Sequence, residues 1–108
     1  MKVGLILVTD DDEGAVIPTI ERWSSFADWL CVADNASTDA SYREVYRWHK
    51  ERARLGLRRL DLLLGMQQKV DAADIVQEVL ERLPGDVEWL YLARVGEIPE
   101  PAGARRRA

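Results

Sequence analysis

Residues 31–40 read CVADNASTDA, and the two halves of this stretch differ in character. An apolar run that begins at Trp29 ends at Ala33, and short hydrogen-bonding side chains follow it from Asp34 to Asp39. A buried strand that opens into a polar turn is typical of the carboxyl end of a strand in a parallel sheet, where ligands bind in open α/β folds. The same side chains can also cap the next helix. The sequence leaves both roles open for different residues of the turn.

The pattern on either side of this stretch predicts an α/β domain. Four apolar runs of strand length alternate with three segments of helical periodicity. This alternation predicts a three-layer, Rossmann-like fold with a parallel four-stranded sheet in the order 3-2-1-4 and helices on both faces. We expect the strands at residues 3–8, 29–33, 57–64 and 87–93, and the helices from about residue 18 to 26, at 42–53 and at 71–83. We expect residues 1–100 to form one domain. Residues 101–108, which include Arg105–Arg107, are expected to form a disordered basic tail.

The second expected helix carries its apolar residues at helical spacing. The apolar face is predicted to contain Tyr42, Val45, Tyr46, His49 and Ala53. His49 is therefore interpreted as a packed, hydrogen-bonded residue rather than a catalytic one. Trp48 falls outside this face, so we expect it to be exposed unless a partner covers it.

The overall composition limits the classes of function. The chain has 108 residues and a formal net charge of −4, which argues against nucleic-acid binding because that binding depends on neutralising phosphates. Its single cysteine, Cys31, is predicted to be a small buried strand residue and suits a reducing compartment. We find no pattern typical of a signal peptide and no apolar segment long enough to span a membrane. A cytoplasmic location is therefore expected.

The polar segments that follow the four strands define the expected binding edge. They lie at residues 9–13, 34–39, 65–67 and 94–97. In parallel sheets the carboxyl ends of the strands meet at one edge, and ligands bind where the strand order reverses. The turn at Asp34–Asp39 therefore lies on the edge where a ligand is expected.

In this order, the segments resemble the amino-terminal half of a family 2 glycosyltransferase with the GT-A fold. The resemblance rests on VTDDDE at residues 8–13, on VADNASTD at residues 32–39 and on WLYLARVGEIP at residues 89–99. The second block is similar to the Asp-Asn/Asp-Gly-Ser-Thr-Asp turn of that family. The resemblance covers nearly the whole chain, but only the first half of a typical catalytic domain of the family.

The resemblance implies a site for a nucleotide-diphosphate sugar. Asp34 or Asn35 would hydrogen-bond the nucleobase, and the loop formed by Thr9, Asp10 and Asp11 would cover the base and ribose. Paired donors and acceptors of this kind discriminate sharply between bases once they are buried.

The chain departs from the family at the metal site. The family places an Asp-X-Asp motif after strand four, and its carboxylates hold Mg²⁺ or Mn²⁺ against the diphosphate. A gapless match places Arg94 and Gly96 at those positions, and a match shifted by one residue places Ala93 and Val95 there. In both cases the two carboxylates are missing and only Glu97 remains nearby. We therefore expect no metal cofactor. Arg94 either pairs directly with phosphate through its planar, permanently charged guanidinium or is only a surface residue at the end of a strand, and the sequence leaves both open. Little or no independent transfer is expected, since the later region of the family, with its catalytic base, is absent from this sequence. Whether the chain is an enzyme stays open.

Two alternative functions remain open at this point. The acidic run at residues 9–13 also resembles the first loop of a response-regulator receiver, but Asp61 lies within strand three rather than at its end. The other alternative is a non-catalytic module for oligomerisation or partner binding. Because strands three and four would be unpaired edges, we expect a homodimer or a partner complex that covers strand four and Trp48.

Overall fold

The computed structural model describes residues 2–104 of the chain, which fold as a mixed sheet with three helices. The strands are β1 (Lys2–Thr9), β2 (Trp29–Asp34), β3 (Leu62–Gly65), β4 (Val87–Arg94) and β5 (Glu100–Ala104), and the helices are α1 (Val16–Trp23), α2 (Ser41–Arg54) and α3 (Ala72–Arg82). The α/β class predicted from the alternating pattern is therefore confirmed.

The first four strands run parallel in the predicted order, and a fifth strand extends the sheet. The complete order is β3-β2-β1-β4-β5, and β5 pairs antiparallel with β4. The expectation of four parallel strands was wrong in this respect. A tight reversal allows the return, because Gly96 has a φ of +89° and Glu97 N–H donates to the carbonyl of Arg94 at 2.9 Å. The expected boundary after residue 100 falls inside β5, and the rest of the expected tail, residues 105–108, lies outside the described residues.

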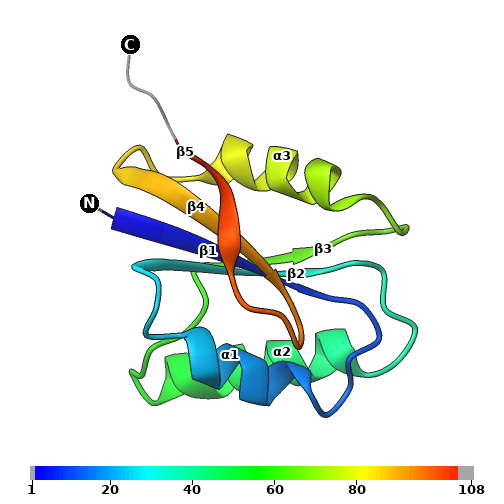
Figure 1. Cartoon of the computed structure of the whole chain (residues 1–108). Coiled ribbons are helices and arrows are strands. Elements are labelled where there is room, and N and C mark those ends of the chain that lie inside the picture. The colour runs from blue at the N-terminus through cyan, green and yellow to red at the C-terminus, as the bar shows by residue number, and fades with distance from the viewer. Residues whose placement is uncertain (1, 105–108) are drawn as a thin grey trace.

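The helices cover both faces of the sheet, with α3 on one side and α1 and α2 on the other (Figure 1). Because side chains alternate across each strand, the sheet contributes to two separate cores. Leu5 and Leu7 pack with Val16, Ile20 and Val45 on the α1/α2 face. The opposite core, under α3, contains Ile6, Val8, Cys31, Ile75, Val79 and Leu90. The continuous apolar run of β1 is thereby explained, since the strand is buried on both sides.

The third strand begins later than predicted. It starts at Leu62 rather than Leu57, because residues 55–57 close the end of α2 instead of entering the sheet. The amide of Gly56 donates to the carbonyl of Ala53, and the amide of Leu57 donates to that of Arg52, the pattern of a Schellman motif. Asp61 consequently precedes β3 and accepts a hydrogen bond from Leu30 N–H at 2.8 Å. It lies at the strand end opposite to the one where a receiver needs its phosphoacceptor.

The buried face of α2 is also rotated from the predicted one. Ser41 and Val45 are fully buried and Trp48 packs against the core, whereas Tyr42 and Tyr46 are exposed. The expectation that Trp48 would be exposed was therefore wrong. His49 is half-buried, but its Nδ1 has no hydrogen-bond partner among the described residues, so the expected hydrogen bond is not found.

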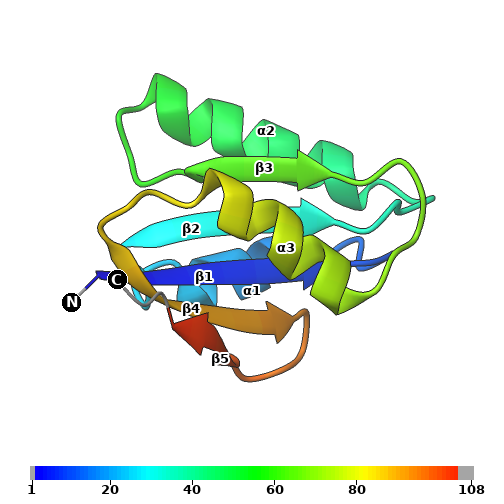
Figure 2. The same ribbon diagram turned by 90° about the horizontal axis from the view of Figure 1, so that it is seen from above.

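The added strand changes which edges of the sheet are free. β4 lies between β1 and β5, so the free edges of the described sheet belong to β3 and β5 (Figure 2). The expected homodimer rests on unpaired edges at strands three and four and on an exposed Trp48. β3 is a free edge of the described sheet, whereas β4 is paired on both sides and Trp48 packs against the core. No helix within residues 2–104 is long and apolar enough to cross a membrane.

Candidate functional site

Three loops meet at the carboxyl-terminal edge of the parallel strands. We call residues 10–15 the first loop, residues 35–40 the second loop and residues 66–71 the third loop; they follow β1, β2 and β3. The pairing of Thr9 with Asp34 and of Asp34 with Gly65 brings these loops together. The topology therefore accounts for the meeting of segments that are far apart in the sequence.

The first loop is held to the second loop and to α2 through four consecutive backbone amides. Asp11 N–H donates to Ser37 Oγ at 3.0 Å, and Asp12 N–H donates to Ser41 Oγ at 2.9 Å. The next two amides, of Glu13 and Gly14, donate to Asp39 Oδ2 at 3.0 Å and to Glu44 Oε2 at 3.2 Å. Each backbone donor of this turn thus has a partner, which an irregular segment needs in order to hold one conformation.

The second loop returns these contacts with its own amides. Thr38 N–H and Asp39 N–H both donate to Asp11 Oδ1, at 2.6 and 3.2 Å. Ala40 N–H donates to Glu13 Oε1 at 2.9 Å. These hydrogen bonds lower the pKa of Asp11, with the Thr38 amide as the largest cause. We call this set of reciprocal bonds the loop lock.

The loop lock answers the question raised by residues 34–39. Asp39 accepts hydrogen bonds from Ser41 N–H at 2.9 Å and from Ser41 Oγ, so it serves the amino-terminal end of α2. Ser37 and Thr38 bond the first loop instead. The acids of the first loop do not cap α1, whose N-cap residue is Ala15 and forms no side-chain cap bond. Most of the polar side chains in this turn therefore hold two loops together.

The third loop is bound to the other two loops through Asn35 of the second loop and its own Lys69. The Asn35 amide forms a two-point contact with Val70, donating to its carbonyl at 3.0 Å and accepting from its N–H at 3.0 Å. Lys69 pairs with Asp10, lies 3.8 Å from Asp11 and donates to the Asn35 carbonyl at 3.3 Å. Its hydrogen bond with Asp10 is the largest cause of its raised pKa. Sequence reasoning missed Lys69 because a lone lysine in a loop carries no pattern.

Two of the predicted site residues, Asp34 and Thr9, are buried, and both form hydrogen bonds within the protein. Asp34 is 4% exposed and accepts hydrogen bonds from Ser37 N–H at 3.0 Å and Ser37 Oγ at 2.6 Å. Thr9 is completely buried, and its hydroxyl donates to Asp12 at 3.2 Å. Thr9 therefore supports the first loop from beneath and has no surface to offer a ligand in this conformation.

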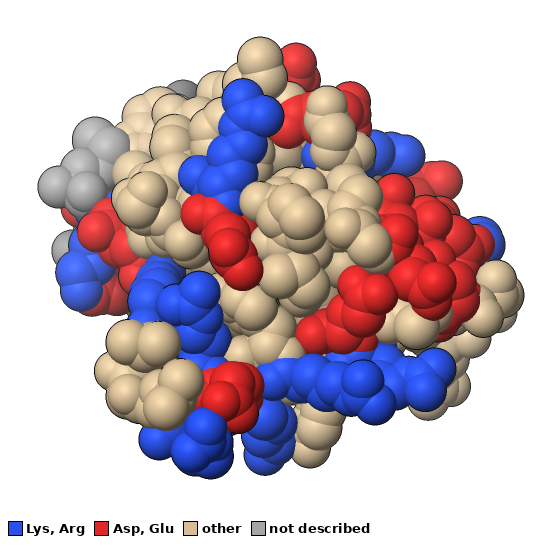
Figure 3. Space-filling view, turned by 90° about the horizontal axis from the view of Figure 1, so that it is seen from below, with Lys and Arg blue, Asp and Glu red and all other residues tan. Residues whose placement is uncertain are grey.

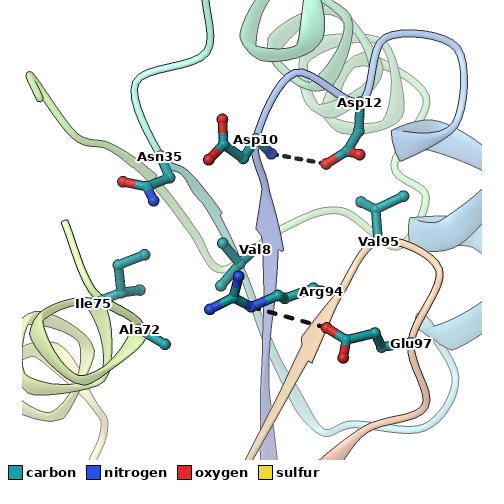
Figure 4. Close-up of a pocket in the computed structure, with 9 residues that line it drawn as sticks. All are labelled: Val8, Asp10, Asp12, Asn35, Ala72, Ile75, Arg94, Val95 and Glu97. Carbon is teal, nitrogen blue, oxygen red and sulfur yellow. Dashed lines mark hydrogen bonds and ion pairs between the residues drawn. The ribbon is translucent and has the colours of Figure 1, made fainter. Parts of the chain in front are cut away.

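A pocket of about 360 Å³ lies on the α3 side of this edge, beside the carboxyl ends of β1 and β4. Figure 4 shows the Arg94 guanidinium in the middle of the lining residues, close to Val8, with Asn35 and α3 beyond it. The residues that line the pocket are Val8, Asp10, Asp12, Asn35, Ala72, Ile75, Arg94, Val95 and Glu97. Four of the predicted site residues, Asp10, Asn35, Arg94 and Glu97, are thus brought together, whereas Thr9, Asp11 and Asp34 are not part of this lining.

The pocket lies where the direction of the strand order changes. From β1 the chain moves to β2 and β3 on one side and then returns to β4 on the other. Open α/β sheets bind ligands at such a position. Ala72 adds the first turn of α3, whose N-terminal end is the positive end of the helix dipole.

The charges around the pocket are unequal. Asp10, Asp12 and Glu97 contribute carboxylates, and Arg94 contributes the single cation among the lining residues. Asp10 is paired with Lys69, whereas the Arg94 Nε lies 3.9 Å from the Glu97 carboxylate, at the limit of an ion pair, with both side chains about 60% exposed. Such an exposed pair contributes roughly 0–1 kcal/mol, so Arg94 can exchange Glu97 for another anion at little cost.

No group of three or more His, Cys, Asp or Glu side chains within residues 2–104 is arranged to hold a metal ion. Protein-family models and curated proteins give no match to this chain. The functional argument therefore rests on the geometry of the edge and on the chemistry of its side chains.

Proposed function

We propose that the chain is a glycosyltransferase-like domain that binds a nucleotide-diphosphate sugar at the Arg94 pocket and has little or no transfer activity by itself. One observation carries this proposal: an arginine with a weak internal partner lies in a pocket at the switch point of an α/β sheet. A guanidinium suits a diphosphate because its planar fork can donate two parallel hydrogen bonds.

The surroundings of Arg94 support an anionic ligand of modest affinity. The amino-terminal turn of α3 at Ala72 favours negative charge, and Val8 and Ile75 provide apolar walls. Asp12 and Glu97 disfavour an anionic ligand, because they place two carboxylates beside the Arg94 pocket. Binding is therefore expected to be weak, and we keep the expectation that it does not need a divalent metal.

The contacts to the base remain those that the resemblance implies. Asp34 and Asn35 already bond Ser37 and Val70, so a nucleobase would have to use their remaining acceptor positions. Asp34 also lines a second, open pocket with Tyr42 and Gly65. We expect Asp34→Ala to reduce discrimination between bases, and we expect it to loosen the second loop as well.

Calorimetric titration with uridine, adenosine and guanosine diphosphates, with and without Mn²⁺, tests the proposal. Arg94→Ala should weaken binding by about 10- to 100-fold, the range for loss of charge-assisted hydrogen bonds, and Arg94→Lys should restore part of it. Arg47→Ala is the matched control, because it removes an exposed arginine on α2, on the other face of the sheet. Equal affinities of the Arg94→Ala and Arg47→Ala variants, or sugar transfer that requires metal, would contradict the proposal.

The formation of a homodimer, or of a complex with a partner chain, also stays a prediction. The apolar edge of β3, Leu62–Leu64, is the part of the described sheet that still favours it, because all three leucines are only half-buried. Light scattering of the purified chain over a range of concentrations is the direct measurement.

A further inference from the structure

The exposed side of α2 carries a regular row of cations. Arg43, Arg47, Lys50 and Arg54 follow one another at intervals of four, three and four residues, so they lie on one stripe of the helix. All four are exposed, and the stripe is opposite Ser41 and Val45, which are buried. At 1.5 Å per residue the row extends over about 17 Å. Figure 3 shows this row as a band of Lys and Arg along the lower edge of the molecule.

The charge of this region is opposite to that of the rest of the protein. Residues 41–59 contain seven Lys or Arg and two Glu, a net charge of +5, in a chain whose net charge is −4. The remainder therefore carries −9, and Asp and Glu gather at the loop end in Figure 3. The positive field also reaches His49, whose pKa is lowered by burial first and then by Arg59 and Lys50. An overall negative protein with such a segregated basic surface has one side that attracts anions and another that repels them.

Several of these cations are available for an external anion. Arg54 pairs with Glu51, and Arg58 bonds the carbonyls of Ala27 and Asp28 and lies near Asp61. In contrast, Arg43, Arg47 and Arg59 have no carboxylate partner among residues 2–104, and Lys50 has only the ring of Tyr46, 5.5 Å away.

Exposed apolar side chains continue the basic surface at the end of α2. Leu55 is 53% exposed and Leu57 is 47% exposed, on either side of Gly56, whose φ is +69°. Four arginines flank this turn, at positions 52, 54, 58 and 59. Tyr42 and Tyr46, also exposed, lie beside the cation row. Tyrosine combines an apolar ring with a polar tip and is favoured at the interface between lipid and water.

The backbone amides of residues 55–57, the turn that carries the two leucines, are all hydrogen-bonded within the protein. The amides of Leu55, Gly56 and Leu57 donate to the carbonyls of Glu51, Ala53 and Arg52. A turn whose amides are already bonded can enter a poorly hydrated environment without the cost of unpaired donors. The two leucines therefore lie on a turn whose amides are all bonded within the protein.

We propose that this surface, α2 with residues 55–59, docks the protein on a membrane that contains anionic lipids. The cations would pair with lipid headgroups, and Leu55 and Leu57 would enter the boundary between headgroups and acyl chains. Charge alone would suit RNA equally well, but an RNA backbone offers no apolar phase for two leucines. The proposal goes beyond nucleotide binding, and the docked protein would keep the Arg94 pocket open, because that pocket lies on the α3 side of the sheet.

Sedimentation with vesicles tests the electrostatic part. The full chain should bind vesicles that contain phosphatidylserine, release them at high salt and bind pure phosphatidylcholine weakly. Arg43→Gln/Arg47→Gln should lower the partition coefficient by roughly 30-fold, given the usual contribution of each cation near an anionic surface. Lys2→Gln/Arg82→Gln removes the same charge elsewhere and should have a small effect. An equal loss in both double variants would overturn the proposal.

The leucines are tested separately. Leu55→Ser/Leu57→Ser should reduce binding by about tenfold, because two partly exposed side chains lose their transfer into lipid. Ile98→Ser, at a large apolar residue that is 75% exposed, should not. A polarity-sensitive dye on Leu57→Cys should shift to the blue on vesicles, and the same dye on Ile98→Cys should not. Native Cys31 would stay unlabelled, since burial raises its pKa to about 12.

The outcomes separate the possible occupants of this surface. Vesicle binding that depends on both the arginines and the leucines supports the proposal. Three outcomes would each overturn it. The protein binds single-stranded RNA but not vesicles, or the Leu55→Ser/Leu57→Ser variant binds vesicles as well as wild type does, or light scattering shows self-association that the Arg43→Gln/Arg47→Gln variant loses.

Discussion

Asp11 Oδ1 accepts a hydrogen bond from the backbone N–H of Thr38 at 2.6 Å, across two loops that are 27 residues apart in the sequence. The same oxygen accepts the N–H of Asp39 and the hydroxyl of Thr38, both at 3.2 Å. Asp11 has a φ of +55°, a conformation that Asp and Asn tolerate better than most residues. One carboxylate thus fixes the second loop from a position that few side chains could occupy.

Replacing this carboxylate should loosen the loop lock. Asp11→Ala removes the acceptor and strains the backbone, and we expect it to lower Tm by roughly 5 °C in a thermal melt. Asp11→Asn keeps an acceptor oxygen and the backbone preference, so its effect should be smaller. Glu21→Ala, at an exposed acid on α1, should leave Tm unchanged. The same Tm for the alanine and wild-type proteins would refute the role given to Asp11.

The loop lock should also weaken in acid. The pKa values of Asp11 and Asp39 are both lowered from 3.8 in the folded protein, by hydrogen bonds to Thr38 and Ser41 respectively. The unfolded chain therefore binds protons more readily than the folded one at low pH. This stabilisation is fully present above about pH 4 and is lost as the pH falls through the lowered pKa values. Urea denaturation as a function of pH should show that wild-type protein loses stability faster than Asp11→Asn below about pH 4.

Ala36 should be replaceable by glycine with a gain in stability. Its φ is +53°, which costs an L-residue with a Cβ roughly 1–2 kcal/mol, whereas glycine adopts it freely. After the greater entropy of unfolded glycine is subtracted, Ala36→Gly should stabilise the fold by about 0.5–1 kcal/mol in urea denaturation. Ala73→Gly, on the exposed side of α3, should instead destabilise it by up to about 1 kcal/mol. A loss of stability in both variants would count against the assigned backbone conformation.

Two glycines in the sheet should respond differently to an added methyl group. A Cβ on Gly4 would lie 3.1 Å from both Leu90 Cδ1 and Val87 Cγ1, inside the core. Gly4→Ala should therefore cost about 1–3 kcal/mol through overpacking. A Cβ on Gly65 would meet only the ring of Tyr42, also at 3.1 Å, and Tyr42 is 41% exposed, so its side chain can move. Comparable losses from Gly4→Ala and Gly65→Ala in chemical denaturation would show that the packing is described wrongly.

The contact between Asn35 and Val70 gives a prediction that combines charge and pH. Asn35→Asp removes the donor to the Val70 carbonyl and places a carboxylate beside that oxygen. The variant should be destabilised by about 1–3 kcal/mol at neutral pH, the cost of an unmade hydrogen bond to a partly buried carbonyl. Protonation of the new carboxyl group restores a donor, so the difference from wild type should shrink below about pH 4. A difference that does not change with pH would argue against this contact.

The sequence predicted the parts of the fold that repeat and missed the parts that depend on single contacts. The apolar runs of β1 and β2 and the periodicity of α3 predicted these elements to within one residue of their observed ends. The strand β5 was missed because Glu100–Ala104 contains a proline and no alternating pattern. The start of β3 was misplaced because Leu57 was interpreted as the first residue of an apolar strand, whereas the hydrogen bonds of Gly56 and Leu57 close the end of α2.

The candidate site shows the same division. The polar turns after the strands correctly predicted that Asp10, Asn35, Arg94 and Glu97 meet at one edge, since strand order alone sets that arrangement. Which of the turn residues remain free for a ligand could not be predicted. Thr9 and Asp34 form hydrogen bonds with Asp12 and Ser37 in the loops that directly follow them, and Asp11 accepts the N–H of Thr38 in the second loop. The bond between Asp11 and Thr38 depends on how the two loops lie relative to each other, and no spacing within either loop encodes that arrangement.

The antiparallel return of β5 has a consequence for engineering. Lys2 pairs with Val87 and Ala104 pairs with Trp89, so the first and last described residues lie near the same end of β4, one on each side of that strand. Both lie at the amino-terminal edge of the parallel strands, opposite the edge that carries the Arg94 pocket (Figure 2). A reporter fused at either end would therefore leave the mouth of that pocket unobstructed, and a short peptide linker could join the two ends in a circularly permuted chain.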